Sequence, residues 1–157
     1  METRYKDSKN KNSVEEGNVF QDYVCDLLLD RCGIIIQNYA SKEYQFNKGE
    51  NKQGFEIKLD NWCYKSKRLS IEIAEKTAIE NYFVESGIYR KDNSIFYVQG
   101  NKDIVFLFSK KLLQMLHKSN RYEDKEEPTI KTFYLPFSDA IRYCITYFEN
   151  KNSEVNP

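Results

Sequence analysis

The chain is short of the residues on which most nucleophilic and zinc-dependent enzymes depend. It has a single histidine, His117, and four cysteines among 157 residues. No two cysteines form the CxxC pair that is typical of zinc sites. A Cys–His or Ser–His catalytic pair therefore has little support, and we expect reduced structural cysteines and a surface position for His117 near the end of a helix. The cysteines are Cys25, Cys32, Cys63 and Cys144.

A net charge and long apolar runs are lacking too. The 24 basic and 24 acidic side chains cancel, so an anionic partner must be met by a local patch and not by the overall charge. No segment approaches the roughly 20 apolar residues that span a bilayer. The opening METRYKDSKNKNS has no apolar core of a signal peptide. We expect a cytoplasmic protein without a membrane partner.

The length suits one domain with a continuous core. Residues 1–12 and 150–157 are polar and predict flexible tails, which leaves residues 13–149 for the domain. Alternating helical and strand-like patterns within it favour the α/β class, with a mixed sheet flanked by helices.

The first helix is predicted between Ser13 and Gly33. Ser13 resembles an N-cap with Glu16 three residues later, and Gly33 a C-terminal stop. Periodicity and turn residues predict the other elements. These are strands at 34–39, 55–60, 69–76, 95–98, 104–108 and 129–136, helices at 76–90, 110–121 and 138–148, and loops at 41–53 and 121–128.

The segment from Gly54 to Lys76 interleaves ionisable and aliphatic residues in two strand-like runs. Successive side chains of a strand point to opposite faces, so each run has one apolar and one charged face. If the runs pair as a hairpin, Asp60 and Glu72 approach each other on the charged face, with Lys58 and Lys76 nearby. Two carboxylates and a lysine on a sheet are the groups that divalent-metal-assisted phosphodiester cleavage needs.

This region resembles the PD-(D/E)xK nuclease superfamily, in which a helix precedes a small sheet whose central strands carry Asp, Glu and Lys. The resemblance covers roughly the first half of the chain and extends to the SGI tripeptide at 86–88 and the hairpin that follows it. It implies a restriction-endonuclease-like mixed central sheet flanked by helices, a Mg²⁺ or Mn²⁺ cofactor and endonuclease activity on DNA. Asp60 would match the first metal-binding aspartate and Glu72 the acidic residue of the second strand.

The sequence departs from the superfamily pattern at Ala74, where the usual lysine is missing. Lys76 and Lys58 lie on the same face by strict alternation, and either is long enough to replace it. In this pairing Glu56 is an accessory group. A second pairing is open, in which Glu56 and Lys58 form the ExK pair. It ranks lower because the preceding residues offer Glu50 but no aspartate.

Further contacts are expected from the first helix and from the loop between the two strands. Superfamily members often supply another metal ligand from the first helix, for which Gln21 and Glu16 are the candidates. We expect nucleic acid, DNA in particular, as the partner, and a homodimer stays open. Lys110 and Lys111 are expected to be exposed at a helix start. The loop residues that combine basic and aromatic groups are Lys65, Lys67, Arg68 and Trp62.

Three other interpretations fit the same pattern. In the first, the charged residues form the solvated face of an ordinary hairpin with cross-strand ion pairs. In the second, the chain is a nuclease-fold module that has lost catalysis and binds nucleic acid or protein, which Ala74 favours. In the third, it is a small interaction domain with an exposed apolar patch. The nuclease interpretation predicts that Asp60→Asn abolishes metal-dependent cleavage and leaves the fold intact.

Overall fold

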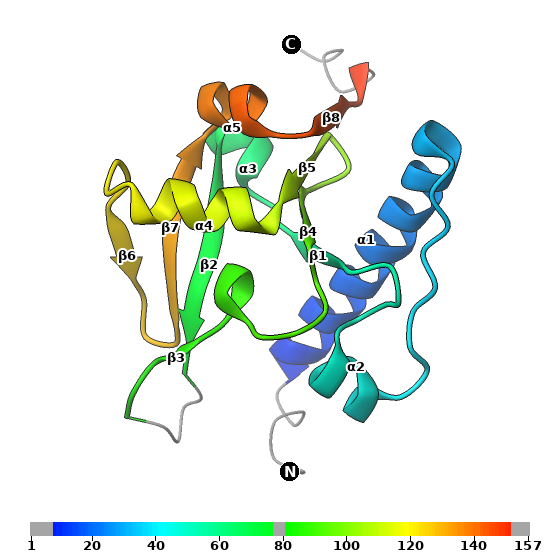
Figure 1. The fold of residues 1–157 in the computed structure, drawn as a ribbon, viewed down its shortest axis with the longest axis horizontal. Helices are drawn as coiled ribbons and strands as arrows, with labels where there is room; N and C mark the ends of the chain where they lie inside the picture. The colour runs from blue at the N-terminus through cyan, green and yellow to red at the C-terminus, as the bar shows by residue number, and fades with distance from the viewer. Residues whose placement is uncertain (1–7, 77–80, 152–157) are drawn as a thin grey trace.

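The computed structural model describes residues 8–76 and 81–151, which form a mixed α/β structure with two four-stranded sheets (Figure 1). The strand orders are β1-β4-β5-β8 and β3-β2-β7-β6. The strands are β1 (Phe55–Leu59), β2 (Arg68–Glu75), β3 (Val84–Glu85), β4 (Phe96–Gly100), β5 (Ile104–Ser109), β6 (Asp124–Glu126), β7 (Ile130–Pro136) and β8 (Thr146–Glu149). The helices are α1 (Ser8–Cys32), α2 (Lys42–Lys48), α3 (Cys63–Ser66), α4 (Lys110–Lys118), α5 (Phe137–Tyr143) and the 3-10 helix η1 (Gly87–Tyr89).

The first sheet is covered by α1 on one face. β1 runs parallel to β4, which forms an antiparallel hairpin with β5. Strand alternation sends Phe55 and Ile57 to the α1 side, where they join a buried cluster. It sends Glu56 and Lys58 to the opposite face. The other buried members of the α1 cluster are Phe20, Val24, Leu28, Val98, Val105 and Leu107.

The second sheet packs its apolar face against the first sheet and α4. β2 pairs antiparallel with β7 along most of its length, and α4 crosses in front of both strands (Figure 1). Leu69 and Ile71 of β2 pack in one core with Phe106 and Phe108 of β5. The side chains of Ser70 and Glu72 point the other way, since they alternate with this apolar set.

The predicted hairpin between the two charged strands is wrong. β1 pairs with β4 and β2 pairs with β7, so the two strands belong to different sheets. The connection between them contains α3, which carries the chain from one layer to the other. The backbone N–H of Ser70, on β2, donates to the Asp60 carboxylate at 3.0 Å. A side chain therefore satisfies a backbone group that a ladder would otherwise use.

Several predicted boundaries also shift. α1 begins at Ser8, inside the predicted tail, so Ser13 is not its N-cap. The predicted strand at 34–39 has only one isolated bridge, and α2 forms within the predicted loop at 41–53. The strand β6 lies in the predicted loop at 121–128.

The predicted helix at 76–90 is not found in its described part. Residues 77–80 lie outside the described residues, and residues 84–89 form β3 and η1. The last predicted helix ends early, at Tyr143, and is followed by β8. The hairpin of β4 and β5, the helix α4 and the strand β7 are confirmed.

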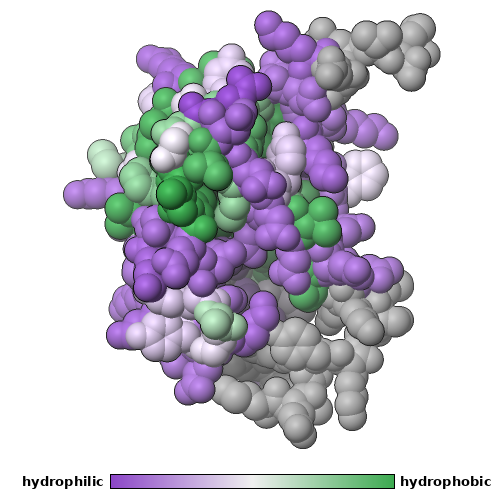
Figure 2. Space-filling view, turned by 90° about the vertical axis from the view of Figure 1, so that its right-hand side faces the viewer, coloured by the Kyte–Doolittle hydropathy of each residue, from purple (hydrophilic) through white to green (hydrophobic). Residues whose placement is uncertain are grey.

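Polar side chains cover most of the face that lies on the right of Figure 1, and apolar side chains gather in one part of it (Figure 2). Val19 and Leu29 of α1 are each half exposed. None of the described helices is long and apolar enough to cross a membrane.

Candidate functional site

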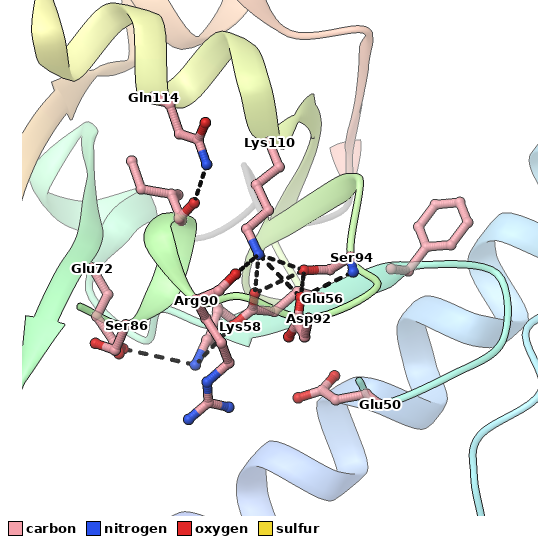
Figure 3. Close-up of polar contacts among 12 residues, drawn as sticks. Glu50, Glu56, Lys58, Glu72, Ser86, Arg90, Asp92, Ser94, Lys110 and Gln114 are labelled. Carbon is pink, nitrogen blue, oxygen red and sulfur yellow. Dashed lines mark hydrogen bonds and ion pairs between the residues drawn. The ribbon is translucent and has the colours of Figure 1, made fainter. Parts of the chain in front are cut away.

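Two carboxylates from different sheets meet at one ammonium group. The Lys58 Nζ atom lies 3.4 Å from Glu56 Oε1 and 3.7 Å from Glu72 Oε2 (Figure 3). Glu56 and Lys58 share a face of β1 because they are two residues apart. Glu72 comes from β2, so the site forms where the two sheets meet.

Buried polar atoms without hydrogen-bond partners gather on this face. Within the described residues, the atoms of this kind are Glu56 Oε1, Tyr97 Oη and Gln99 Oε1. Tyr97 stands opposite Glu56 in the β1–β4 register, and Gln99 stands opposite Lys58. Buried polar groups are normally hydrogen-bonded. Glu56 Oε1 is instead paired with the Lys58 ammonium, which leaves Tyr97 Oη and Gln99 Oε1 as the two atoms of this set without a described partner.

The protonation equilibria of the site reflect its burial. Glu56 is only 3% exposed, and burial raises the pKa of its carboxyl although Lys58 and Lys110 lower it. Glu50 accepts a 3.5 Å hydrogen bond from the Ile57 N–H, and burial likewise raises its pKa. Burial alone would lower the pKa of Lys58. The negative charges of Glu72, Glu56 and Glu50 outweigh this effect of burial and raise the pKa of Lys58, so the ammonium stays charged.

A second lysine holds Glu56 from the other side. Lys110, the first residue of α4, is 4% exposed and donates to the Arg90 carbonyl at 2.8 Å, to Asp92 Oδ1 at 3.1 Å and to Ser94 Oγ at 2.6 Å. Its Nζ also lies 3.8 Å from Glu56 Oε2 (Figure 3). Burial alone would raise the pKa of Asp92, but hydrogen bonds from Ser94 and the charge of Lys110 lower it.

The expectation that Lys110 is exposed is therefore wrong. β5 ends at Ser109 and α4 begins at the next residue, so Lys110 starts the helix at the level of the sheet and reaches inward. Lys111 is exposed as expected. Nothing in the local sequence distinguishes the two lysines, because the difference comes from a loop, residues 90–94, that packs against one of them.

Glu72 is held by the segment that precedes η1. Ser86 Oγ donates to Glu72 Oε1 at 2.6 Å. The next residue, Gly87, has φ +54°, and a Cβ atom there would lie 2.2 Å from the Glu72 carbonyl oxygen. Only glycine allows both this backbone conformation and this close approach.

Asp60 lies in a different environment from Glu72. Its Oδ2 accepts hydrogen bonds from Ser70 N and from Gln99 Nε2, both at 3.0 Å. Lys58 and Ser86 contact Glu72 instead. Ser70 and Glu72 are neighbours on one face of β2, about 7 Å apart along the strand. Asp60 thus joins the two sheets beside the site, and its described contacts do not include the Glu56–Lys58–Glu72 cluster.

Of the two candidate lysines, the structure brings Lys58 to the carboxylates. Lys76 Nζ lies 4.7 Å from the centre of the Phe83 ring. The pairing of Glu56 with Lys58, which ranked second on the sequence, is the one whose side chains share a site. That pairing called for an upstream aspartate, which residues 44–53, just before β1, do not contain. In the structure the acidic partner of Lys58 is Glu72 of β2, and Glu50 lies at the border of the cluster.

The candidate residues of α1 and of the basic loop lie outside the cluster. Glu16 accepts from Asn61 at 3.3 Å, and Gln21 donates to Asn38 at 3.3 Å. Trp62 is 69% exposed. The basic groups of the loop each lie over a ring: Lys65 over Trp62, Lys67 over Tyr64 and Arg68 over Tyr134.

Mg²⁺ is usually held by one or two carboxylates with several waters. Glu56 and Glu72 are two carboxylates of this kind, and the Lys58 ammonium contacts both of them. A larger ligand set is not found in the described part of the chain, where no three His, Cys, Asp or Glu side chains are grouped so that they could hold a metal ion.

No family model, no curated protein and no solved structure matches this chain. Its function must therefore be inferred from the site itself.

Proposed function

We propose that the chain is a Mg²⁺-dependent nuclease of the restriction-endonuclease-like type, which hydrolyses phosphodiester bonds in DNA. One observation carries the proposal: Glu56 and Glu72, from two sheets, flank the Lys58 ammonium at 3.4 and 3.7 Å, beside buried polar atoms that have no hydrogen-bond partner. Acidic groups and a lysine gathered in one place are the groups that metal-assisted phosphodiester cleavage requires.

Each side chain has a distinct part in this proposal. Glu56 and Glu72 would hold the metal ion, and Mn²⁺ could replace Mg²⁺ there. When bound, the ion would polarise the scissile phosphate and lower the pKa of a water molecule. Lys58 keeps its proton because the surrounding carboxylates raise its pKa. Its positive charge would offset the negative charge that develops on the phosphate oxygens.

Two features support nucleic acid as the substrate. The basic residues Lys65, Lys67 and Arg68 lie between α3 and the start of β2, the strand that carries Glu72: Lys65 is in α3, Lys67 follows that helix and Arg68 is the first residue of β2. Trp62 is exposed beside these residues and offers a surface on which a base can stack. Since the chain has no net charge, a local patch of this kind would have to attract the phosphate backbone.

A second function, a nuclease-fold module without catalysis, is favoured by the charge balance of the site. Lys58 pairs with Glu56 and Glu72, and Lys110 pairs with Glu56 and Asp92. A paired network of this kind satisfies the charges of a polar core without any ligand. Ala74, in place of the usual lysine, agrees with this alternative.

A DNA cleavage assay with Mg²⁺ or Mn²⁺ separates the two functions. We expect cleavage by the original protein and a loss of about 10²-fold or more in Glu72→Gln. The matched control is Glu126→Gln, which removes an exposed carboxylate on β6 that pairs with Lys131. It should cleave at the full rate. If the original protein does not cut, or if Glu72→Gln cuts as fast as the control, the nuclease proposal is wrong.

A further inference from the structure

A polar pocket lies on the α4 side of η1, and none of its lining residues belongs to the Glu56–Lys58–Glu72 cluster. Its volume is about 510 Å³. η1, α4, β6 and the turn between α4 and β6 contribute its walls. The lining residues are Tyr89, His117, Lys118, Asn120, Tyr122 and Asp124.

Three of these side chains form a continuous hydrogen-bonded chain. The Tyr89 hydroxyl lies 2.6 Å from His117 Nδ1, and His117 Nε2 lies 2.8 Å from Asp124 Oδ1. An ionised carboxylate can only accept, so Nε2 carries the proton and donates to Asp124. Nδ1 of the neutral ring is then an acceptor, and the Tyr89 O–H donates to it. The three residues thus fix one tautomer of the imidazole.

The position of the imidazole ring is also fixed. It stacks on Phe133 of β7 with a centroid distance of 5.2 Å and an interplanar angle of 23°. The Tyr89 ring meets it edge-on at 5.5 Å. His117 is therefore not the simple surface residue that its place near a helix end predicts. It is held by contacts from η1, β6 and β7.

The Tyr89 hydroxyl keeps its proton near neutral pH. Burial raises its pKa, and the charges of Glu85 and Asp124 raise it further. Such a phenol can act as a nucleophile only if a neighbouring base takes its proton. A hydroxyl, a base within hydrogen-bond reach and a third group that orients the base form the arrangement by which proteins activate weak nucleophiles.

We propose that Tyr89, His117 and Asp124 form a second reactive site, in which Tyr89 accepts the phosphoryl group of a phosphodiester together with its second ester group. The Tyr89 Oη atom forms a bond to phosphorus, and the hydroxyl proton moves to His117 Nδ1. Asp124 stabilises the imidazolium that results. The bond from phosphorus to the first ester oxygen breaks, and this oxygen leaves with the electron pair, either as an anion or after it takes the proton from His117. Lys118, whose Nζ lies 5.6 Å from the centre of the Tyr89 ring, and Asn120 supply a charge and an amide donor that suit an anionic phosphate.

The test uses bis(p-nitrophenyl) phosphate as the probe, with EDTA present so that no divalent metal contributes. We expect release of about one equivalent of p-nitrophenolate per chain and one covalent p-nitrophenyl phosphoryl label on Tyr89, located by peptide mass spectrometry. Tyr89→Phe should abolish the label. Asp124→Asn should slow it by about 10²-fold, the size of a typical acid–base contribution. Tyr147→Phe, which removes a hydroxyl on β8, should label at the full rate.

A different result is expected if Tyr89, His117 and Asp124 only hold η1, α4 and β6 together. The proposal is overturned if Tyr89 stays unlabelled, if other tyrosines are labelled as fast, or if Asp124→Asn labels at the full rate. Thermal unfolding of each variant is the folding control, and Tyr89→Phe keeps the ring against His117. Glu72→Gln should label normally, so failure of this site and failure of the proposed nuclease site can be told apart.

Discussion

At the scale of single residues, the site depends on two lysines that lie among carboxylates, of which Lys110 is buried and Lys58 is half-buried. Lys58 and Lys110 each contact Glu56, from opposite directions. A buried charge is tolerated only when it is paired and hydrogen-bonded. The long lysine stem lets the ammonium reach groups on other elements, so each of these two residues joins parts of the fold as well as charges.

Lys110→Met should destabilise the protein strongly. The variant keeps the length and apolar stem of the side chain but leaves Glu56 and Asp92 without their shared cation. Removing one partner of a buried ion pair typically costs about 3–5 kcal/mol. Urea unfolding measures the change in free energy. Lys111→Met, at the exposed neighbouring position, is the control and should change the free energy of unfolding by less than about 0.5 kcal/mol.

Equal effects of Lys110→Met and Lys111→Met would contradict the buried network around Glu56.

At the scale of elements, Asp60 links the end of β1 to the start of β2. Its carboxylate accepts from Ser70 N and from Gln99 Nε2, and Gln99 Nε2 also donates to the Ser70 carbonyl at 2.8 Å. These bonds serve backbone groups of β2 that no neighbouring strand satisfies at this point. The structure therefore gives Asp60 a role in joining the two sheets, which the sequence did not indicate.

Asp60→Ala should reduce stability, whereas the sequence-based expectation for this position is that Asp60→Asn leaves the fold intact. Loss of the acceptor leaves Ser70 N and Gln99 Nε2 short of a partner, at a cost of about 1–3 kcal/mol. Urea unfolding, compared with Asp22→Ala on the exposed side of α1, measures this cost. A free energy of unfolding equal to that of the control would show that Asp60 does not join the sheets.

At the scale of the whole molecule, the elements that the sequence predicts are those set by local periodicity. The β4–β5 hairpin follows from two apolar runs around a polar turn, and α4 from leucines at helical spacing. Charged and apolar faces of β1 and β2 follow from strict alternation, which also places Glu56 with Lys58. The sequence does not reveal that Phe55 pairs with Phe96, because that pairing joins distant segments.

The same limit applies to the site. Glu72 reaches Lys58 only because two sheets meet there, and Lys110 reaches Glu56 only because the segment before β4 folds under α4. These are tertiary contacts without a local signature. The residue types therefore predict that acidic groups and a lysine form a site. They do not predict which of these residues come together.

The pH dependence of stability is a property of the whole molecule to which Glu50 contributes. Its folded-state pKa is raised, mainly by burial. The folded state therefore holds the proton more tightly than the unfolded state. The stability that this group contributes is present below about pH 4.5, its ordinary pKa, and is lost as the pH rises through the folded value.

Glu50→Gln should become progressively more stable, relative to the original protein, as the pH rises from about 4.5 to 7. Urea unfolding at several pH values without divalent metal measures the difference between the two proteins. Glu43→Gln, an exposed position on α2, should show no such trend. A difference that stays constant over this range would contradict the raised folded-state pKa of Glu50.

Titration calorimetry with Mg²⁺ tests the central claim most directly, because the proposed function requires Glu56 and Glu72 to hold one ion together. We expect the original protein and Glu126→Gln to bind Mg²⁺, and Glu56→Gln and Glu72→Gln each to bind more than about tenfold more weakly. Absence of binding to the original protein, or equal binding by all four proteins, would contradict the account.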